Sequence, residues 1–189
     1  MFKQILVAAA AVAFVAAPAL AQDNSMSMGG MKKDPMVGGA PMYSSKTIVG
    51  NAVNSKDHTT LVALVEKAGL VDTLSSAGPF TVFAPTNEAF DKIPKATLDA
   101  VGDDKATLTK VLTYHVIAGK YDSAAIAALI KTGGGKATLK TVQGEDLYAS
   151  MDGPNLILTD AHGGKSTVTI ADVYQSNGVI HVVDTVLMP

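Results

Sequence analysis

The sequence predicts an α+β domain, an antiparallel sheet of the sandwich or wedge type with several helices packed on it. Apolar residues recur at helical spacing in the first half, between residues 60 and 131. From residue 136 onward, short alternating runs are separated by glycine-containing turns, which is the pattern of strands. Helices followed by strands favour the α+β class. About 146 residues follow Tyr43, which is the size of one ordinary domain.

The expected helices each carry a start or stop signal. Gly69 can end the first, and Pro94 introduces the third, which Gly102 should stop. Asp103 or Asp104 can cap the fourth. Asp122 or Ser123 can cap the last. In chain order, these helices are expected at 60–68, 71–76, 95–101, 105–113 and 123–131.

The expected strands fall mainly in the second half. The run 136–142 alternates lysine or threonine with apolar residues, which predicts one wet face and one dry face. Asp152-Gly153-Pro154-Asn155 is a hairpin signal between two such runs. The run 179–187 is almost continuously apolar, so we expect a central strand covered on both faces. In chain order, the strands are expected at 80–83, 114–118, 136–142, 147–151, 156–159, 166–170 and 179–187.

The segment from Thr81 to Phe90 reads Thr-Val-Phe-Ala-Pro-Thr-Asn-Glu-Ala-Phe. Pro85 should end the strand because proline has no N–H to donate to a neighbouring strand. Thr86 then stands where a helix N-cap belongs, and Glu88 places negative charge at the positive end of that helix. The segment therefore predicts a strand, a turn and a capped helix, with Phe83 and Phe90 in the core.

The segment from Asn177 to Pro189 closes the sequence and begins with Asn177-Gly178. This dipeptide predicts a type I′ hairpin turn, which needs two residues with positive φ. His181 and Asp184 interrupt the apolar run that follows. Each needs a hydrogen-bond partner if it is buried, and we interpret His181 as a satisfied core histidine.

These two segments, with Tyr114-His115-Val116 between them, resemble the two boxes and the central Tyr-His of the fasciclin domain, an extracellular adhesion module. The resemblance runs from about Ser45 to Pro189. It implies the fasciclin fold and a set of structural motif residues, namely Thr81, Phe83, Pro85, Thr86, Asn87, Phe90, Asn177, Gly178, His181 and Asp184.

The resemblance also nominates Tyr114 and His115 as ligand-binding residues, because the matching segment of animal relatives has been implicated in receptor binding. On a strand, the two side chains would point to opposite faces. We therefore expect at most one of them to be exposed. The hypothesis is an exposed, partner-binding Tyr114 beside a structural, hydrogen-bonded His115.

Composition argues against nucleic-acid binding and against cysteine chemistry. Every basic residue is lysine, and the formal net charge is −2 from 15 lysines and 17 acidic residues. Nucleic-acid binding is therefore not expected, since it needs a basic face and often arginine forks. The absence of cysteine excludes disulfides and a lipidated cysteine.

The first 43 residues divide into two expected segments. Met1 to Ala21 has a lysine, an apolar stretch and an Ala-Leu-Ala cleavage motif, which predicts a secretory signal peptide. Residues 22–43 are rich in methionine and glycine and poor in branched apolar residues, which predicts a flexible tether. The fasciclin domain is then expected at 44–189, secreted or periplasmic, with possible attachment to the cell surface and no transmembrane segment.

No enzyme is indicated. The four histidines lack metal-ligand spacing, and no nucleophile elbow, zinc motif or phosphate loop is present. We therefore assign no catalytic residue and no cofactor. One alternative is copper handling, because Met26, Met28 and Met31 offer three soft thioether ligands for Cu(I).

The sequence thus predicts an exported bacterial, non-catalytic binding or adhesion module. Its partner would be a surface protein or a polysaccharide. Some fasciclin relatives hold carotenoid pigments, so a small-molecule binder is a second alternative to adhesion. An apolar cleft would favour that alternative.

Overall fold

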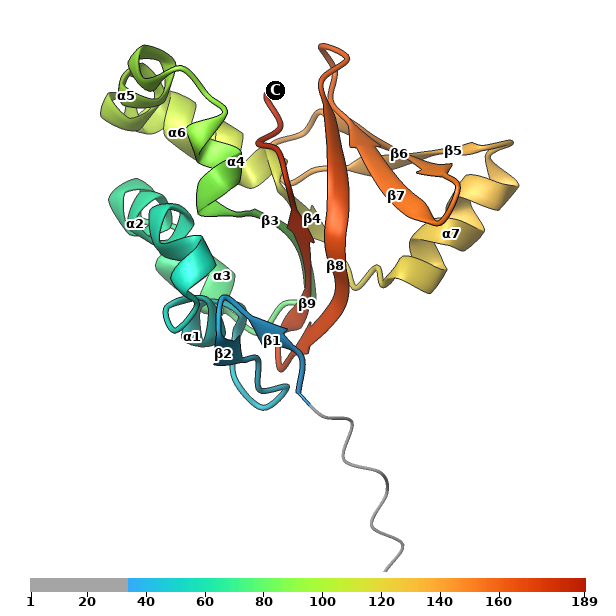
Figure 1. Cartoon of the computed structure of the whole chain (residues 1–189), viewed down its shortest axis with the longest axis horizontal. Coiled ribbons are helices and arrows are strands. Elements are labelled where there is room, and N and C mark those ends of the chain that lie inside the picture. Colours follow the sequence, from blue (N-terminus) through green and yellow to red (C-terminus); the bar gives the residue numbers. More distant parts are fainter. Residues whose placement is uncertain (1–33) are drawn as a thin grey trace, which may run out of the picture. The chain divides into compact units, whose positions relative to one another are not determined.

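A computed structural model describes residues 34–189 of the chain (Figure 1). The helices are α1 (Ile48–Ala52), the 3₁₀ turn η1 (Lys56–His58), α2 (Thr59–Ala68), α3 (Val71–Ser75), α4 (Asn87–Asp91), α5 (Lys95–Asp103), α6 (Lys105–Tyr114) and α7 (Ser123–Thr132). The strands are β1 (Met36–Val37), β2 (Ala40–Pro41), β3 (Phe80–Pro85), β4 (Val116–Ala118), β5 (Lys136–Lys140), β6 (Asp146–Asp152), β7 (Asn155–Thr159), β8 (Lys165–Gln175) and β9 (Gly178–Val183). Within residues 34–189, no helix combines the length and the apolar character needed to cross a bilayer.

The main sheet has seven strands in the order β4-β3-β9-β8-β7-β6-β5. All neighbouring strands are antiparallel except β3 and β9, which run parallel. The chain after β5 returns to the opposite edge, where Thr141 bridges Ile117 and the Val142 N–H donates to the Val116 carbonyl at 2.8 Å. The two edges of the sheet therefore approach each other at one end.

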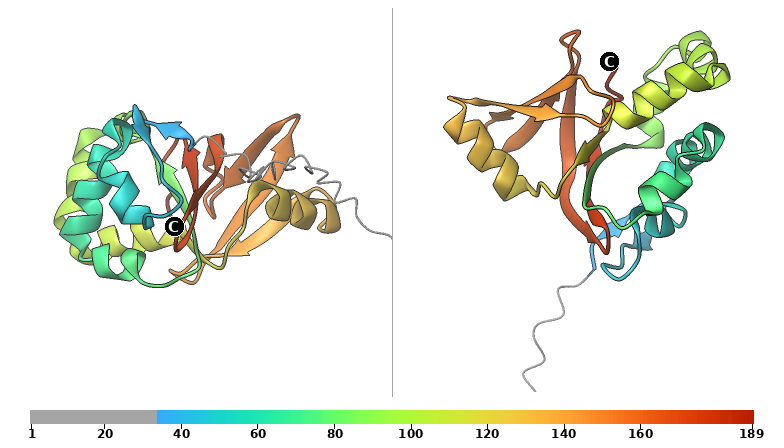
Figure 2. Two further views of the ribbon diagram at one scale, coloured as in Figure 1. Left: turned by 90° about the horizontal axis from the view of Figure 1, so that it is seen from below. Right: turned by 180° about the vertical axis from the view of Figure 1, so that it is seen from behind.

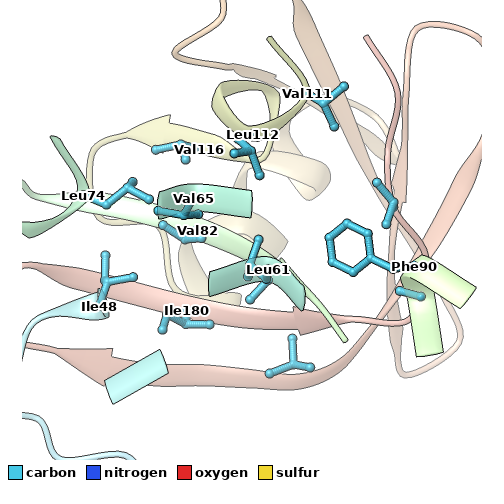
Figure 3. Close-up of a cluster of buried hydrophobic side chains, with 14 of the residues drawn as sticks. Ile48, Leu61, Val65, Leu74, Val82, Phe90, Val111, Leu112, Val116 and Ile180 are labelled. Carbon is cyan, nitrogen blue, oxygen red and sulfur yellow. The ribbon is translucent and has the colours of Figure 1, made fainter. Parts of the chain in front are cut away.

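Two hydrophobic cores flank the paired strands β3 and β9, because alternate residues of a strand point to opposite faces. The helix-side core lies between these strands and α1 to α6 (Figure 3). The sheet-side core lies between the same strands, the β5–β7 strands and α7 (Figure 2). Val82, Ala84, Ile180 and Val182 face the helix side, whereas Phe83 and Val183 face the sheet side.

The expected central strand is confirmed. Every residue of β9 is buried, and β9 is paired on one side with β3 and on the other with β8. The α+β class is confirmed as well. The sheet is mixed rather than wholly antiparallel, because the parallel β3–β9 pair joins residues about a hundred positions apart, which no local pattern indicates.

Most helix signals act as expected. Gly69 has a left-handed conformation with φ 76° at the end of α2. Asp104 and Asp122 accept hydrogen bonds from first-turn N–H groups of α6 and α7. Gly102 does not stop α5, which runs on to Asp103. The run 179–187 is a strand only to Val183, although Leu187 is buried further on.

The expected tether boundary at Tyr43 differs from the structure. Residues 36–41 form the β1–β2 hairpin, and Val37 and Met42 are buried in the helix-side core. The Lys56 N–H donates to the Gly38 carbonyl at 3.2 Å, which ties the hairpin to the turn before α2. The folded domain therefore includes residues 36–43. The expected signal peptide, 1–21, and the tether up to residue 33 lie outside the described residues.

Candidate functional site

Tyr114 and His115 do not lie on a strand. Tyr114 is the last residue of α6, His115 is its C-cap, and β4 begins only at Val116. Both side chains are buried, with exposed fractions of 0% and 3%. The expectation of an exposed Tyr114 is therefore wrong. The alternation rule for strands does not apply to the end of a helix, and here both side chains turn inward.

The Tyr114 hydroxyl links the end of α6 to two segments of the sheet-side half. It donates to the Asp146 carbonyl at the start of β6, and it accepts from the Ala161 N–H in the β7–β8 turn, both at 3.1 Å. Because donor and acceptor capacities of the hydroxyl are both used, Tyr114 has no polar group left for a partner.

His115 holds the C-terminal segment. Its Nδ1–H donates to the Val111 carbonyl at 2.8 Å, and its Nε2 accepts from the Leu187 N–H at 3.0 Å. Burial lowers the pKa of His115 to about 4, although the Val111 carbonyl and Asp160 oppose the shift. The ring is thus neutral, because a proton on Nε2 would face the Leu187 N–H. The structural role expected for His115 fits this geometry.

The first of the two boxes, Thr81 to Phe90, folds as a strand and a capped helix. The Thr81 hydroxyl donates to the Gly119 carbonyl and accepts from the Tyr121 N–H, which fixes the chain after β4. Pro85 ends β3, and the Thr86 hydroxyl accepts from the Ala89 N–H at the start of α4. Phe83 and Phe90 are buried on the two sides of the sheet, as expected.

Asn87 acts on a helix other than its own. Its side-chain oxygen accepts from the Thr60 N–H at 3.0 Å, and its amide donates to the Lys56 carbonyl at 2.8 Å. The α2 helix has no side-chain cap from its own N-cap residue, His58. Asn87 therefore caps α2 from across the chain.

The turn at Asn177-Gly178 is not type I′. Neither residue has positive φ, so the expected turn type is wrong. Asn177 is a buried link instead: its oxygen accepts from the Ile48 N–H, and its amide donates to the Leu74 and Ser76 carbonyls. A glycine is required at position 178 because β3 lies close to it: an added Cβ would lie 2.0 Å from the Phe80 carbonyl oxygen.

His181 is a satisfied core histidine. Its ring stacks on Phe83 with centroids 5.5 Å apart. The Nε2–H donates to the Tyr121 carbonyl at 2.8 Å, and Nδ1 accepts from the Asp172 N–H at 3.4 Å. Burial lowers the pKa of His181, with the Tyr121 carbonyl and nearby carboxylates opposing. Asp184 follows β9, accepts from the Thr167 N–H at 2.8 Å and faces Lys92.

The motif residues thus form a structural framework. Most of their polar side-chain atoms are hydrogen-bonded, many of them to backbone groups distant in the sequence. Among residues 34–189, no three His, Cys, Asp or Glu side chains gather as metal ligands. The proposed copper ligands Met26, Met28 and Met31 lie outside the described residues.

Hollows adjoin this framework: Phe90 lines one of them, and Phe83 and His115 line another. An open hollow of about 490 Å³ lies along α4 and α5, lined by residues 90–95, 98 and 99. A smaller apolar cavity of about 50 Å³ lies in the helix-side core. One of its lining residues, His58, was not singled out by the sequence, because an isolated histidine before a helix carries no motif.

Comparison with known proteins identifies the family. The sequence profile of the fasciclin domain matches residues 56–189, so the chain belongs to the fasciclin domain family. The resemblance of the two boxes and the central Tyr-His is confirmed.

Similar proteins occur in cyanobacteria and mycobacteria. The chain is 41% identical over 161 residues to protein sll1483 of Synechocystis, covering 84% of this chain and 82% of that protein. It is 37% identical over 166 residues to the cell surface glycolipoprotein MPB83 of Mycobacterium bovis, covering 86% of this chain and 64% of that one. It is 33% identical over 168 residues to the immunogenic protein MPB70 of the same species, covering 86% and 73% of the two chains.

A solved structure supports the fold. A FAS1 domain pair from the insect cell adhesion molecule fasciclin I aligns with a TM-score of 0.63 and 18% identity. The alignment covers 76% of this chain and 51% of that chain. At this identity the likeness shows the fold alone, and it agrees with the α+β fasciclin fold expected from the sequence.

Proposed function

We propose that this protein is an exported, non-catalytic binding module that attaches to a protein or polysaccharide at the cell surface or in the periplasm. The observation that carries the proposal is membership of an adhesion-domain family, one member of which is named a cell surface glycolipoprotein. Export rests on the signal peptide proposed at residues 1–21, and sequencing the N-terminus of the secreted protein tests that boundary.

The burial of the motif residues restricts where a partner can bind. Tyr114, His115 and His181 are buried, and their polar atoms are bonded to backbone groups. A partner in solution therefore meets other residues. Recognition by the exposed surface of a rigid domain needs no covalent chemistry, which agrees with the proposed absence of catalysis.

Attachment is tested with the mature protein on beads. We expect the beads to retain cells of the host, and protease or periodate treatment of those cells to abolish retention for a protein or a polysaccharide partner respectively. Tyr114→Phe is the matched variant: its ring is buried, so retention should follow only the folded fraction. Beads that retain no more cells than albumin-coated beads would contradict the proposal.

The two alternatives have separate tests. A long pigment needs more room than a cavity of about 50 Å³, which holds roughly two water-sized groups. Colour in the protein purified from its host would nevertheless support the pigment alternative. Copper in the same sample, lost on replacing Met26, Met28 and Met31 by leucine, would support copper handling.

A further inference from the structure

The strands β5 to β8 have an outer face that neither hydrophobic core uses (Figure 1). Their inner face carries Leu139, Leu147 and Leu158, which are buried in the sheet-side core. Alternate residues of a strand point to the opposite face, and paired residues of neighbouring strands share a face. The register therefore places eight side chains on the outer face in two rows, which we call the outer grid. One row is Thr138, Tyr148, Thr159 and Lys165, and the other is Lys136, Ser150, Ile157 and Thr167.

The outer grid is in contact with solvent. All eight residues are exposed or partly exposed. The helix α7 packs on the opposite face, where Ile126 and Ile130 join the sheet-side core. Tyr148 and Ile157 belong to neither core. The grid therefore keeps one aromatic ring and one aliphatic side chain at the surface, each among polar neighbours.

Two lysines stand at opposite corners of the grid. The Lys136 ammonium lies 3.7 Å from the centroid of the Tyr148 ring, and Lys165 is on the far strand, β8. Within residues 34–189, neither lysine makes an ion pair with a carboxylate. None of the eight grid residues is acidic, although the whole chain has a formal net charge of −2. The grid is thus a positive patch on a chain with an excess of acidic residues.

Protection of a sheet edge does not explain both lysines. Lysine on an edge strand hinders pairing with another chain, which fits Lys136 and Lys140 on β5. Lys165 protects no edge, because β8 lies between β7 and β9. The acidic residues Asp146 and Asp152 are on β6 beyond the two rows, and Asp146 is paired with Lys140 at 3.3 Å. The two corner lysines are therefore available to an anionic ligand.

Hydroxyl groups occupy most of the grid between the lysines. Within residues 34–189 these hydroxyls make no hydrogen bond to another protein group, whereas the Thr81 hydroxyl of the framework both donates and accepts. Each hydroxyl can donate and accept a hydrogen bond, which suits a ligand that is itself rich in hydroxyls. The hydroxyls belong to Thr138, Tyr148, Ser150, Thr159 and Thr167.

This composition favours a sugar polymer over a protein as the ligand. The centres of protein interfaces are enriched in aromatic residues, methionine and arginine and depleted in lysine and serine, whereas the grid has one aromatic ring among lysines and hydroxyls. On a flat sheet with strands about 4.8 Å apart, the Cα atoms of Lys136 and Lys165 would lie roughly 16 Å from each other. A single sugar ring does not span that distance, but an oligosaccharide of several units does.

We propose that the outer grid binds an acidic polysaccharide whose sugar units carry carboxylates. The carboxylates pair with Lys136 and Lys165, and the sugar hydroxyls hydrogen-bond to the hydroxyls between them. The inference rests on the proposed attachment function and deepens it, because it names the class of partner and the face that holds it.

The test is calorimetric titration of the mature protein with three polymers in calcium-free buffer. Sodium alginate carries both carboxylates and sugar hydroxyls, dextran carries hydroxyls alone, and polyaspartate carries carboxylates alone. We expect alginate to bind, and the other two to bind roughly tenfold more weakly, because each lacks one kind of contact. Added salt should weaken alginate binding, since exposed charge pairs are screened.

Variants with the same change of net charge locate the site. The double variant Lys136→Gln/Lys165→Gln should bind alginate roughly tenfold more weakly, as expected for two exposed charge pairs. Lys95→Gln/Lys110→Gln removes two exposed lysines of α5 and α6, so it is the matched control and should bind like the wild type. Thr159→Val removes one central hydroxyl with little change of shape and should weaken binding roughly fivefold.

Three results would overturn the proposal: no binding of alginate by the wild type, equal binding by the two double variants, or binding of polyaspartate or dextran as tight as that of alginate. The wild-type titrations decide the first and the third, so a variant that fails to fold does not protect the proposal. If the beads of the attachment test retain cells while alginate stays unbound, this inference fails and the attachment function stands. Alginate binding without retention of cells would support the grid and contradict the attachment function.

Discussion

Acidification should destabilise this protein through His115. The ring must be neutral in the folded state, because Nε2 accepts from the Leu187 N–H while Nδ1–H donates to the Val111 carbonyl. Its pKa is about 4 when folded and about 6.5 in an unfolded chain. Between these two values the unfolded chain binds a proton that the folded protein does not. The stabilisation is therefore complete above pH 6.5 and is lost as the pH falls toward 4.

The magnitude follows from the difference in pKa. About 2.5 units at about 1.36 kcal/mol each gives a loss on the order of 3 kcal/mol between pH 6.5 and 4. The pKa values of His58 and His181 are also lowered by burial, so their contributions have the same sign. The measured slope of unfolding free energy against pH should therefore exceed the share of His115 alone.

The assay is urea unfolding followed by circular dichroism at half-unit steps from pH 4 to 8. His115→Gln keeps a polar side chain but removes the titrating group, so its curve should be flatter by up to about 1.4 kcal/mol per pH unit. His162→Gln removes an exposed histidine and should keep the wild-type slope. Equal slopes for wild type and His115→Gln between pH 4 and 6.5 would refute the reasoning.

Three further predictions concern stability and use the same unfolding measurement. Phe83→Ala should cost about 3–5 kcal/mol as a large-to-small change in a full core, and a loss below about 1 kcal/mol would contradict the burial of this ring. Gly178→Ala should cost about 1–3 kcal/mol of stability or prevent folding, because the new methyl group meets a β3 carbonyl oxygen. A variant as stable as the wild type would show that β3 and β9 are not in close contact. A chain that begins at residue 44 lacks two buried side chains of the β1–β2 segment, so its free energy of unfolding should fall by about 3–6 kcal/mol. A chain that begins at residue 34 keeps these side chains and should be as stable as the full chain. Equal stability of the two shortened chains would restore the domain boundary at residue 44.

Local signals in the sequence determined most of the elements. Helical spacing of apolar residues, the glycine that ends α2 and the caps Asp104 and Asp122 act over a few residues, so they are legible without the fold. The apolar run of β9 likewise indicated a strand covered on both faces. The family boxes determined the fold for the same reason, because each box is itself a strand with its turn or cap.

The tertiary structure decided what these residues do, because their partners are distant in sequence. Tyr114 is buried since its hydroxyl meets the Asp146 carbonyl and the Ala161 N–H, and no pattern near residue 114 announces those groups. Asn177 lies in the turn between β8 and β9, as the sequence indicated, and its side chain also links the start of α1 to the segment after α3, which no local pattern indicates.

Burial of short polar or small-residue segments is also a tertiary effect. The β1–β2 residues have a composition that suggests a tether, yet Val37 and Met42 enter a core formed by helices that follow them. The sequence by itself determined the family and the order of the elements, because these depend on local patterns; packing determined which side chains form the framework, because their partners are distant in the sequence.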